Sequence, residues 1–259
     1  MINRRSFIGS LGGFSMLAAA GPGEAATEKR RIFILEHYYL KNGTQAGRMH
    51  EHCKAAIPVL GKVHSGPKIF LEALVASHMP QIAVIIGFAS LDELWSVRAS
   101  LHADGDLSRA FETWENHPEQ PYEHYSTTLL EATDYCPEVK PAESPRQTPR
   151  VFELRTYHSP THRQLKALHE RFAGPEIRIF HRTGVHPILY SSTLFGQNMP
   201  NLTYVIPFDN LAEREKAWTA FSADPEWVRV RAESIEKHGQ ISSVSQISLY
   251  RATPYSPIR

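Results

Sequence analysis

The sequence predicts an α+β fold in which two ferredoxin-like repeats, each with the element order β-α-β-β-α-β, are stacked sheet to sheet as an intrachain α/β barrel. Two observations lead to this prediction. The strand-like segment 32–38 recurs as 151–157 at a shift of 119 residues, and the Met-Pro pair at 79–80 recurs at 199–200. Matching segments at such a constant spacing indicate an internal repeat.

Each repeat begins with a strand that leads into a helix. The first strands are predicted at about 31–39 and 150–157, and the helices at about 44–60 and 161–180. In the first of these helices the apolar residues recur at helical spacing. They are Met49, Cys53, Ile57 and Leu60.

An antiparallel hairpin follows the helix in each repeat, because two apolar runs are separated by a short turn. The paired segments are 68–76 with 81–88, and 187–195 with 202–208. A second helix is then predicted in each repeat, at about 91–116 and 209–237. Asp209-Asn210 stands before the second of these helices as a candidate N-cap.

The last strands, 125–132 and 241–250, complete the two sheets. In the second of them polar and apolar residues alternate with the period of a strand. Each plait has helices on one face of its sheet, so the other face must be buried against something else. We therefore expect repeat one to span 31–136 and repeat two to span 150–252, with their sheets packed together. The Pro-rich segment 137–149 would be the linker.

The N-terminal segment 1–26 has the pattern of a twin-arginine signal peptide. Arg4 and Arg5 precede Phe7-Ile8, a moderately apolar stretch follows, and small residues then provide a cleavage site. The apolar stretch is too short and too interrupted by glycine for a transmembrane helix. We expect a periplasmic or secreted bacterial protein with no stable membrane anchor after cleavage.

The composition of the chain limits the classes of molecule that it is expected to bind. The 259 residues carry 28 Lys and Arg against 27 Asp and Glu, a net charge of +1. A chain without excess positive charge gives no support for nucleic-acid binding. Cys53 and Cys136 would lie in an oxidising compartment, where either a disulfide or two separate thiols can occur.

Several segments of repeat two resemble the NIPSNAP family. They are Glu153-Leu154-Arg155-Thr156-Tyr157, Gly184, the run from Tyr204 to Arg214, and Asp224-Pro225-Glu226-Trp227. Repeat one looks like a diverged copy that lacks the Asp-Pro-x-Trp signature. The resemblance implies the dimeric α+β barrel fold, whose members include cofactor-free monooxygenases, haem enzymes and binding proteins. It transfers no catalytic residues, and fold alone does not choose among these activities.

The first strands carry the candidate site. Alternation predicts that Phe152 and Leu154 face the helices, so that Glu153, Arg155 and Tyr157 face the barrel interior. The corresponding residues of repeat one include Glu36 and Tyr38. Glu36 and Arg155 can then meet as a structural ion pair, or line one cavity as part of an anion-binding site.

Histidine supplies the remaining candidates among 14 such residues. His50 and His169 occupy the same place on the two first helices, as packing residues or as a base beside a pocket. Arg182 lies near the turn into the hairpin, where it can be solvated or rim a cavity. No Cys or His pattern completes a metal site, and no histidine stands out as a haem ligand, so we predict no metal and no cofactor.

The preferred hypothesis is an exported protein that binds a small apolar or anionic organic molecule in a cavity between sheet and helices. A cofactor-free monooxygenase or isomerase is the first alternative, with Tyr157, His169 and Arg155 as candidate catalytic residues and Tyr38 beside them. A non-enzymatic scaffold is the second alternative. Assembly into a homo-oligomer is compatible with all three.

Overall fold

The computed structural model describes residues 31–136, 139 and 148–259. The predicted signal peptide, 1–26, and most of the predicted linker, 137–149, lie outside these residues. We call residues 31–136 the first half and residues 148–259 the second half.

Both halves have the same order of strands and helices. The first half consists of β1 (Ile32–Tyr39), α1 (Gln45–Val63), β2 (Lys68–Val75), β3 (Gln81–Phe88), α2 (Leu91–Ala103), α3 (Gly105–Glu115) and β4 (His124–Ala132). The second half consists of β5 (Val151–His158), α4 (His162–Arg171), a π-turn (Phe172–Glu176), α5 (Ile177–Thr183), β6 (Leu189–Phe195), β7 (Asn201–Phe208), α6 (Leu211–Ala223), α7 (Pro225–His238) and β8 (Val244–Ala252).

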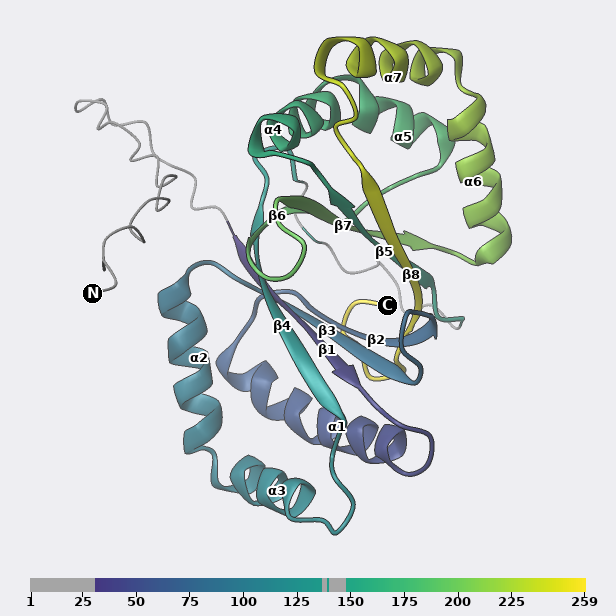
Figure 1. Ribbon diagram of the computed structural model, residues 1–259. Helices are drawn as coiled ribbons and strands as arrows, with labels where there is room; N and C mark the ends of the chain where they lie inside the picture. The colour runs from purple at the N-terminus through teal and green to yellow at the C-terminus, as the bar shows by residue number, and fades with distance from the viewer. Residues whose placement is uncertain (1–30, 137–138, 140–147) are drawn as a thin grey trace, which may run out of the picture.

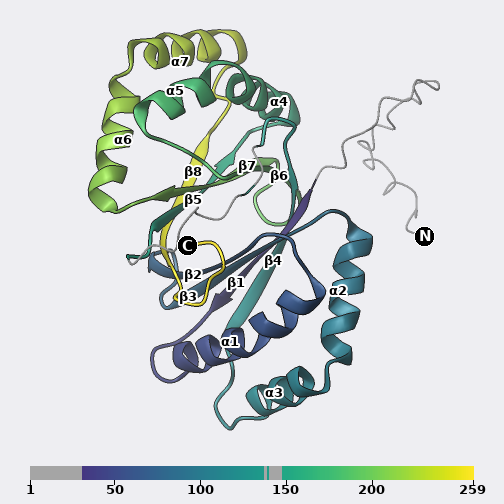
Figure 2. The same cartoon turned by 180° about the vertical axis from the view of Figure 1, so that it is seen from behind.

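The eight strands form one closed antiparallel barrel, in the order β1-β3-β2-β8-β5-β7-β6-β4. Each half contributes four consecutive strands, and the two sets join where β2 pairs with β8 and β4 pairs with β6. The helices of the two halves lie on opposite outer sides of the barrel (Figures 1 and 2). The predicted α+β class and the intrachain barrel are thus confirmed.

The barrel interior is filled by apolar side chains from both halves. Phe33 and Leu35 of β1 and Phe152 and Leu154 of β5 belong to one buried cluster. Because successive side chains of a strand point to opposite faces, Glu153 and Arg155 face the helices. The prediction had these two faces of β5 exchanged and was wrong. The prediction placed Glu153 and Arg155 inside the barrel, whereas the barrel interior beside these residues is apolar.

Capping residues explain where the helices begin. Ser90 caps α2 and Asn210 caps α6, each by accepting a hydrogen bond from a backbone N–H three residues later. The long second helices predicted at 91–116 and 209–237 are each two helices. The break occurs at Asp104 and at Asp224, whose side chains cap α3 and α7 in the same way.

The predicted helix 161–180 is also divided. α4 and α5 are joined by a π-turn in which Gly174 has non-helical φ/ψ angles and precedes Pro175. Proline disfavours helical geometry in the residue before it, which accounts for the kink. α5 ends at Gly184, whose positive φ of 91° is a left-handed conformation that glycine adopts without strain.

Candidate functional site

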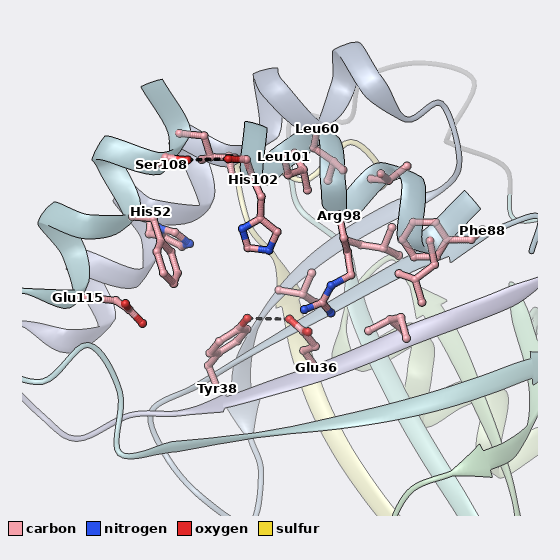
Figure 3. A pocket seen from close by; sticks show the side chains of 18 of the residues that line it. Glu36, Tyr38, His52, Leu60, Phe88, Arg98, Leu101, His102, Ser108 and Glu115 are labelled. Carbon is pink, nitrogen blue, oxygen red and sulfur yellow. Dashed lines mark hydrogen bonds between the residues drawn. The ribbon is translucent and has the colours of Figure 1, made fainter. Parts of the chain in front are cut away.

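A cavity of about 600 Å³ lies in the first half, between the outer face of the sheet and the three helices that cover it (Figure 3). Strands β1 and β3 form its floor, and α1, α2 and α3 form its walls. Its apolar lining is Ile34, Ala56, Leu60, Val84, Ile86, Phe88, Leu94, Val97, Leu101, Leu107 and Phe111. Its polar and charged lining is Glu36, Tyr38, His52, Arg98, His102, Ser108, Glu112 and Glu115. A mostly apolar cavity with a few polar groups is typical of small-molecule sites.

The cavity exists because the first half has small side chains where the second half has large ones. β1 pairs with β3 in the same register as β5 with β7, so that Val84 opposite Glu36 corresponds to Tyr204 opposite Arg155. The helices α2 and α6 are likewise equal in length and offset by 120 residues.

Further positions repeat this contrast. At the same offset, Leu101 of α2 corresponds to Phe221 of α6, and Leu107 of α3 corresponds to Trp227 of α7. The large residues of the second half pack into one aromatic cluster, in which the rings of Phe221 and Trp227 are 4.4 Å apart. Because each aromatic side chain fills far more volume than leucine or valine, the corresponding space of the first half is left hollow.

The polar end of the cavity is built on β1. Tyr38 donates a hydrogen bond of 2.7 Å to Oε2 of Glu36, and both side chains are partly buried. Figure 3 shows Arg98 and His102 reaching down from α2 toward this pair. The Arg98 guanidinium also lies 5.7 Å from the ring of Trp95. The strand thus holds the carboxylate rigidly, while α2 brings a cation and an imidazole over it.

Burial and the carboxylate of Glu36 determine the protonation states of Tyr38 and His52 at the polar end of the cavity. Desolvation, the charge of Glu36 and the hydrogen bond to it raise the pKa of Tyr38 far above its usual range. Desolvation lowers the pKa of His52, whose ring stacks on Trp114 at 4.1 Å. Tyr38 therefore stays a neutral donor at neutral pH, and His52 stays uncharged. Glu36 is the carboxylate of the cavity that lies beside the Tyr38 donor.

In the second half the same face of the first strand is occupied by a closed polar cluster. Glu153 is fully buried, and its two oxygens accept hydrogen bonds from Arg155, Arg214 and Trp218. Arg155 also donates to the hydroxyl of Tyr157, and its guanidinium lies 3.7 Å from the ring centroid of Trp218. Glu153, Arg155 and Tyr157 thus bind one another and α6, and they do not line the cavity.

The structure does not bring Glu36 and Arg155 together. Within the described residues, each carries its own partner on its own half of the barrel: Tyr38 for Glu36, and Glu153 for Arg155. The expectation that these two residues meet or share one cavity was wrong, because both strands turn these side chains outward to separate helical layers.

His50 and His169 hold the two halves together. Nδ1 of His50 lies 2.7 Å from the hydroxyl of Tyr255, which follows β8, and Nδ1 of His169 lies 2.5 Å from the hydroxyl of Tyr135, which follows β4. Each histidine thus meets a tyrosine that follows the last strand of the other half. Nε2 of His169 also forms a hydrogen bond with the hydroxyl of Ser192. Burial lowers the pKa of His169 to about 4.

Arg182 lies on the surface of the second half. Its guanidinium donates hydrogen bonds to the carboxylates of Asp224 and Glu226 at the start of α7. The ion pairs tie α5 to the Asp-Pro-x-Trp segment, and they place Arg182 away from the cavity of the first half.

Three further findings concern a disulfide, a metal site and a membrane-spanning helix. Cys53 and Cys136 do not form a disulfide with each other. Across residues 31–136, 139 and 148–259, no group of three or more His, Cys, Asp or Glu side chains is placed to hold a metal ion. In the same residues, no helix has the length and apolar character needed to cross a membrane.

Sequence reasoning found Glu36 and Tyr38 but missed the rest of the cavity. Arg98, His102 and Leu107 carry no motif of their own. A comparison of side-chain size between the two halves would have found Arg98 and Leu107, since Arg98 stands where the second half has Trp218, and Leu107 where it has Trp227.

Solved structures support the fold. The chain is similar to an anthrone oxidase-like protein, with 13% identity, a TM-score of 0.53, and coverage of 88% of this chain and 92% of that one. It is similar to a candidate monooxygenase from Lactobacillus acidophilus, with 12% identity, a TM-score of 0.53, and coverage of 86% and 94%. A third similar structure is a candidate monooxygenase from Fusobacterium nucleatum, with 8% identity, a TM-score of 0.57, and coverage of 86% and 92%. At these identities the likeness concerns the fold alone.

No curated protein matches the sequence. The NIPSNAP family model matches residues 152–257, which span the second half from β5 to the segment after β8. The resemblance predicted for this half is therefore confirmed. Residues 152–257 thus match the NIPSNAP family model, within a chain whose two halves close one α+β barrel.

Proposed function

We propose that this protein binds a small, mainly apolar organic molecule in the cavity of its first half. The observation that carries the proposal is the contrast between the halves: the same architecture is filled by Tyr204, Phe221 and Trp227 on one side and leaves about 600 Å³ open on the other. That volume lies within the range of ~300–1,000 Å³ found for ligand pockets. An apolar cavity also costs stability, so its presence favours a role in binding.

A neutral fluorescent dye tests this proposal. N-phenyl-1-naphthylamine, which gains emission in apolar surroundings, should bind the purified protein with saturable enhancement. The double variant Leu101→Phe and Leu107→Trp, which introduces the side chains of the second half, should abolish that enhancement. The control is Leu91→Phe, which makes the same change as Leu101→Phe at an exposed position of α2 outside the cavity lining.

Equal binding by the wild type and the filled variant would contradict the proposal. Circular dichroism and thermal melting of the filled variant would show that its fold is retained. Enhancement lost equally in the Leu91→Phe control would show that the dye reports on the surface of α2 and not on the cavity.

A second candidate is chemistry on the bound molecule, as in a cofactor-free monooxygenase or isomerase. The observation that favours it is the carboxylate of Glu36 inside the cavity, next to the neutral Tyr38 donor. A carboxylate within hydrogen-bond reach of a bound molecule can act as a general base and remove an acidic proton from it. Glu36→Gln should then abolish turnover of a bound substrate while dye binding is kept, whereas His169→Gln should leave turnover unchanged.

The N-terminal signal remains a proposal. We propose export through the twin-arginine pathway, on the pattern of Arg4, Arg5 and the apolar stretch that follows. Fractionation of cells that express the full chain should place the mature protein in the periplasm or medium. The double substitution Arg4→Lys and Arg5→Lys should retain it uncleaved in the cytoplasm. Unchanged export of that variant would contradict a twin-arginine signal.

A further inference from the structure

The carboxylate of Glu36 is only partly satisfied. Its Oε2 accepts the hydrogen bond from Tyr38, and none of the described residues donates to Oε1. Glu36 is half-buried, and Oε1 is not among the fully buried atoms that lack a partner, so that water or a ligand can reach it from the cavity. An acceptor therefore remains open on the cavity side of β1.

The second half shows how the same architecture satisfies a carboxylate with its own residues. There Arg214 and Trp218 of α6 both donate to Glu153. At the equivalent positions of α2 the first half has Leu94, which cannot donate, and Arg98, which forms no ion pair with Glu36. Glu36 also lies two residues further along its strand than the counterpart of Glu153, and no described residue of α2 donates a hydrogen bond to it.

The opposite charges of Glu36 and Arg98 restrict what can lie between these two side chains. Glu36 lies on the floor, and the Arg98 guanidinium points toward it from α2 across the empty space (Figure 3). An ammonium group next to Glu36 would also face the cation of Arg98, and a carboxylate next to Arg98 would also face Glu36. A neutral group that both donates and accepts a hydrogen bond satisfies both sides.

We propose that the ligand is an uncharged ring compound with a hydroxyl group, such as a phenol or an enol, whose hydroxyl donates to Glu36 Oε1 and accepts from Arg98. The apolar body of the ligand would occupy the space between Val84, Leu101 and Leu107. This inference rests on the proposed binding function and adds the chemical class of the ligand to it.

A series of ligands built on one ring system tests the class. 2-Naphthol, 2-methoxynaphthalene, 2-naphthoate and 2-(aminomethyl)naphthalene have the same apolar body and differ in the polar group. Their affinities are measured by displacement of N-phenyl-1-naphthylamine. We expect 2-naphthol to bind about 10-fold more tightly than 2-methoxynaphthalene, as one hydrogen bond to a charged group predicts. The two charged analogues should bind more weakly than 2-naphthol.

Two variants assign the effect to the proposed partners. Glu36→Leu should remove the preference for 2-naphthol over 2-methoxynaphthalene, and Arg98→Leu should reduce it, while both variants still bind the dye. The control Glu51→Gln changes an exposed carboxylate of α1 that does not line the cavity, and it should keep the full preference.

The outcomes separate this inference from the binding proposal. Dye binding with equal affinity for 2-naphthol and its methyl ether would overturn the hydroxyl class and leave the cavity proposal intact. Tighter binding of the ammonium or the carboxylate analogue would overturn it as well. Failure of the dye and of all four analogues to bind would contradict the proposed function itself.

Discussion

Glu36 and Glu153 lie on the same outward face of two equivalent strands, and their surroundings differ sharply. Glu153 is buried and accepts hydrogen bonds from two arginines and a tryptophan. Among the residues that the structure describes, Tyr38 is the one donor to Glu36, whose carboxylate faces a cavity. A fully paired carboxylate fixes the packing of a helix on a sheet, whereas a carboxylate with an open acceptor is available to a ligand. The same type of residue thus has a structural role in one half and a candidate binding role in the other.

Two buried histidines should make the stability of the folded protein depend on pH. Burial lowers the pKa of His37 and that of His169 to about 4, from about 6.5 in an unfolded chain. Between these values the unfolded state binds more protons than the folded state, so stability is full above pH 6.5 and falls as the pH decreases toward 4. From pH 6.5 to pH 5 each histidine should cost up to ~2 kcal/mol of unfolding free energy.

Chemical denaturation at several pH values measures this effect. The variants His37→Leu and His169→Gln should each show a shallower fall in stability on acidification than the wild type. His102→Gln, at an exposed position, serves as the control and should keep the wild-type slope. A slope unchanged in both buried-site variants would show that other groups cause the acid sensitivity.

At the scale of elements, the packing of the helices on the sheet decides where space remains. α6 and α7 place Phe221 and Trp227 against the sheet of the second half, where they are packed with Phe180 and Tyr204. α2 and α3 place Leu101 and Leu107 at the corresponding positions. The two layers share their N-caps, the length of α2 and α6 and the strand register, whereas the side chains that α2 and α3 turn toward the sheet at these positions are smaller.

Removal of aromatic volume from the second half should therefore create a second cavity. The double variant Phe221→Leu and Trp227→Leu should lose about 3 kcal/mol of unfolding free energy, as large-to-small changes in a core do. It should also bind more dye per chain than the wild type, which we measure by fluorescence titration. Unchanged stoichiometry together with the loss of stability would mean that the second half collapses around the vacated space.

The sequence predicted the elements more successfully than their faces. Repeated spacing and alternating apolar residues located all eight strands and their order, because these patterns are local. The orientation of β5 was misassigned, because Phe152 and Leu154 alternate with Glu153 and Arg155 on a strand that is buried on both sides. On such a strand the polarity of the side chains does not show which face of the sheet meets the helices, because a buried cluster of charged residues can lie on either face.

The cavity shows a different limit of sequence reasoning. Glu36 and Tyr38 could be selected because they stand at the positions of β1 that correspond to Arg155 and Tyr157 of β5. Arg98 and Leu107 carry no such signal by themselves, and only their small size beside the tryptophans of the second half points to them, because their role depends on how far α2 and α3 stand from the sheet. That distance results from the packing of many side chains and is not encoded in any single motif.

For the whole molecule, the closed barrel makes each half dependent on the other. β2 and β4 of the first half pair with β8 and β6 of the second, so that either half alone would expose two unpaired strand edges. It would also expose the apolar sheet face that carries Phe152, Leu154 and Val205 in the second half. Burial of that face is a large part of the free energy of folding, and an isolated half must recover it.

We therefore expect the second half, expressed alone as residues 148–259, to form a homodimer. In such a dimer β6 of one copy would pair with β8 of the other, so that two identical four-stranded sheets would close the same eight-stranded barrel around a twofold axis. Size-exclusion chromatography with light scattering should give twice the mass of the fragment. Denaturation should depend on protein concentration, because folding and association would be coupled. The full chain serves as the comparison: its midpoint of denaturation should depend on concentration less steeply, because its barrel closes within one molecule. A folded, stable monomer of the fragment would show that the barrel interface contributes little to stability and that each half is an independent folding unit.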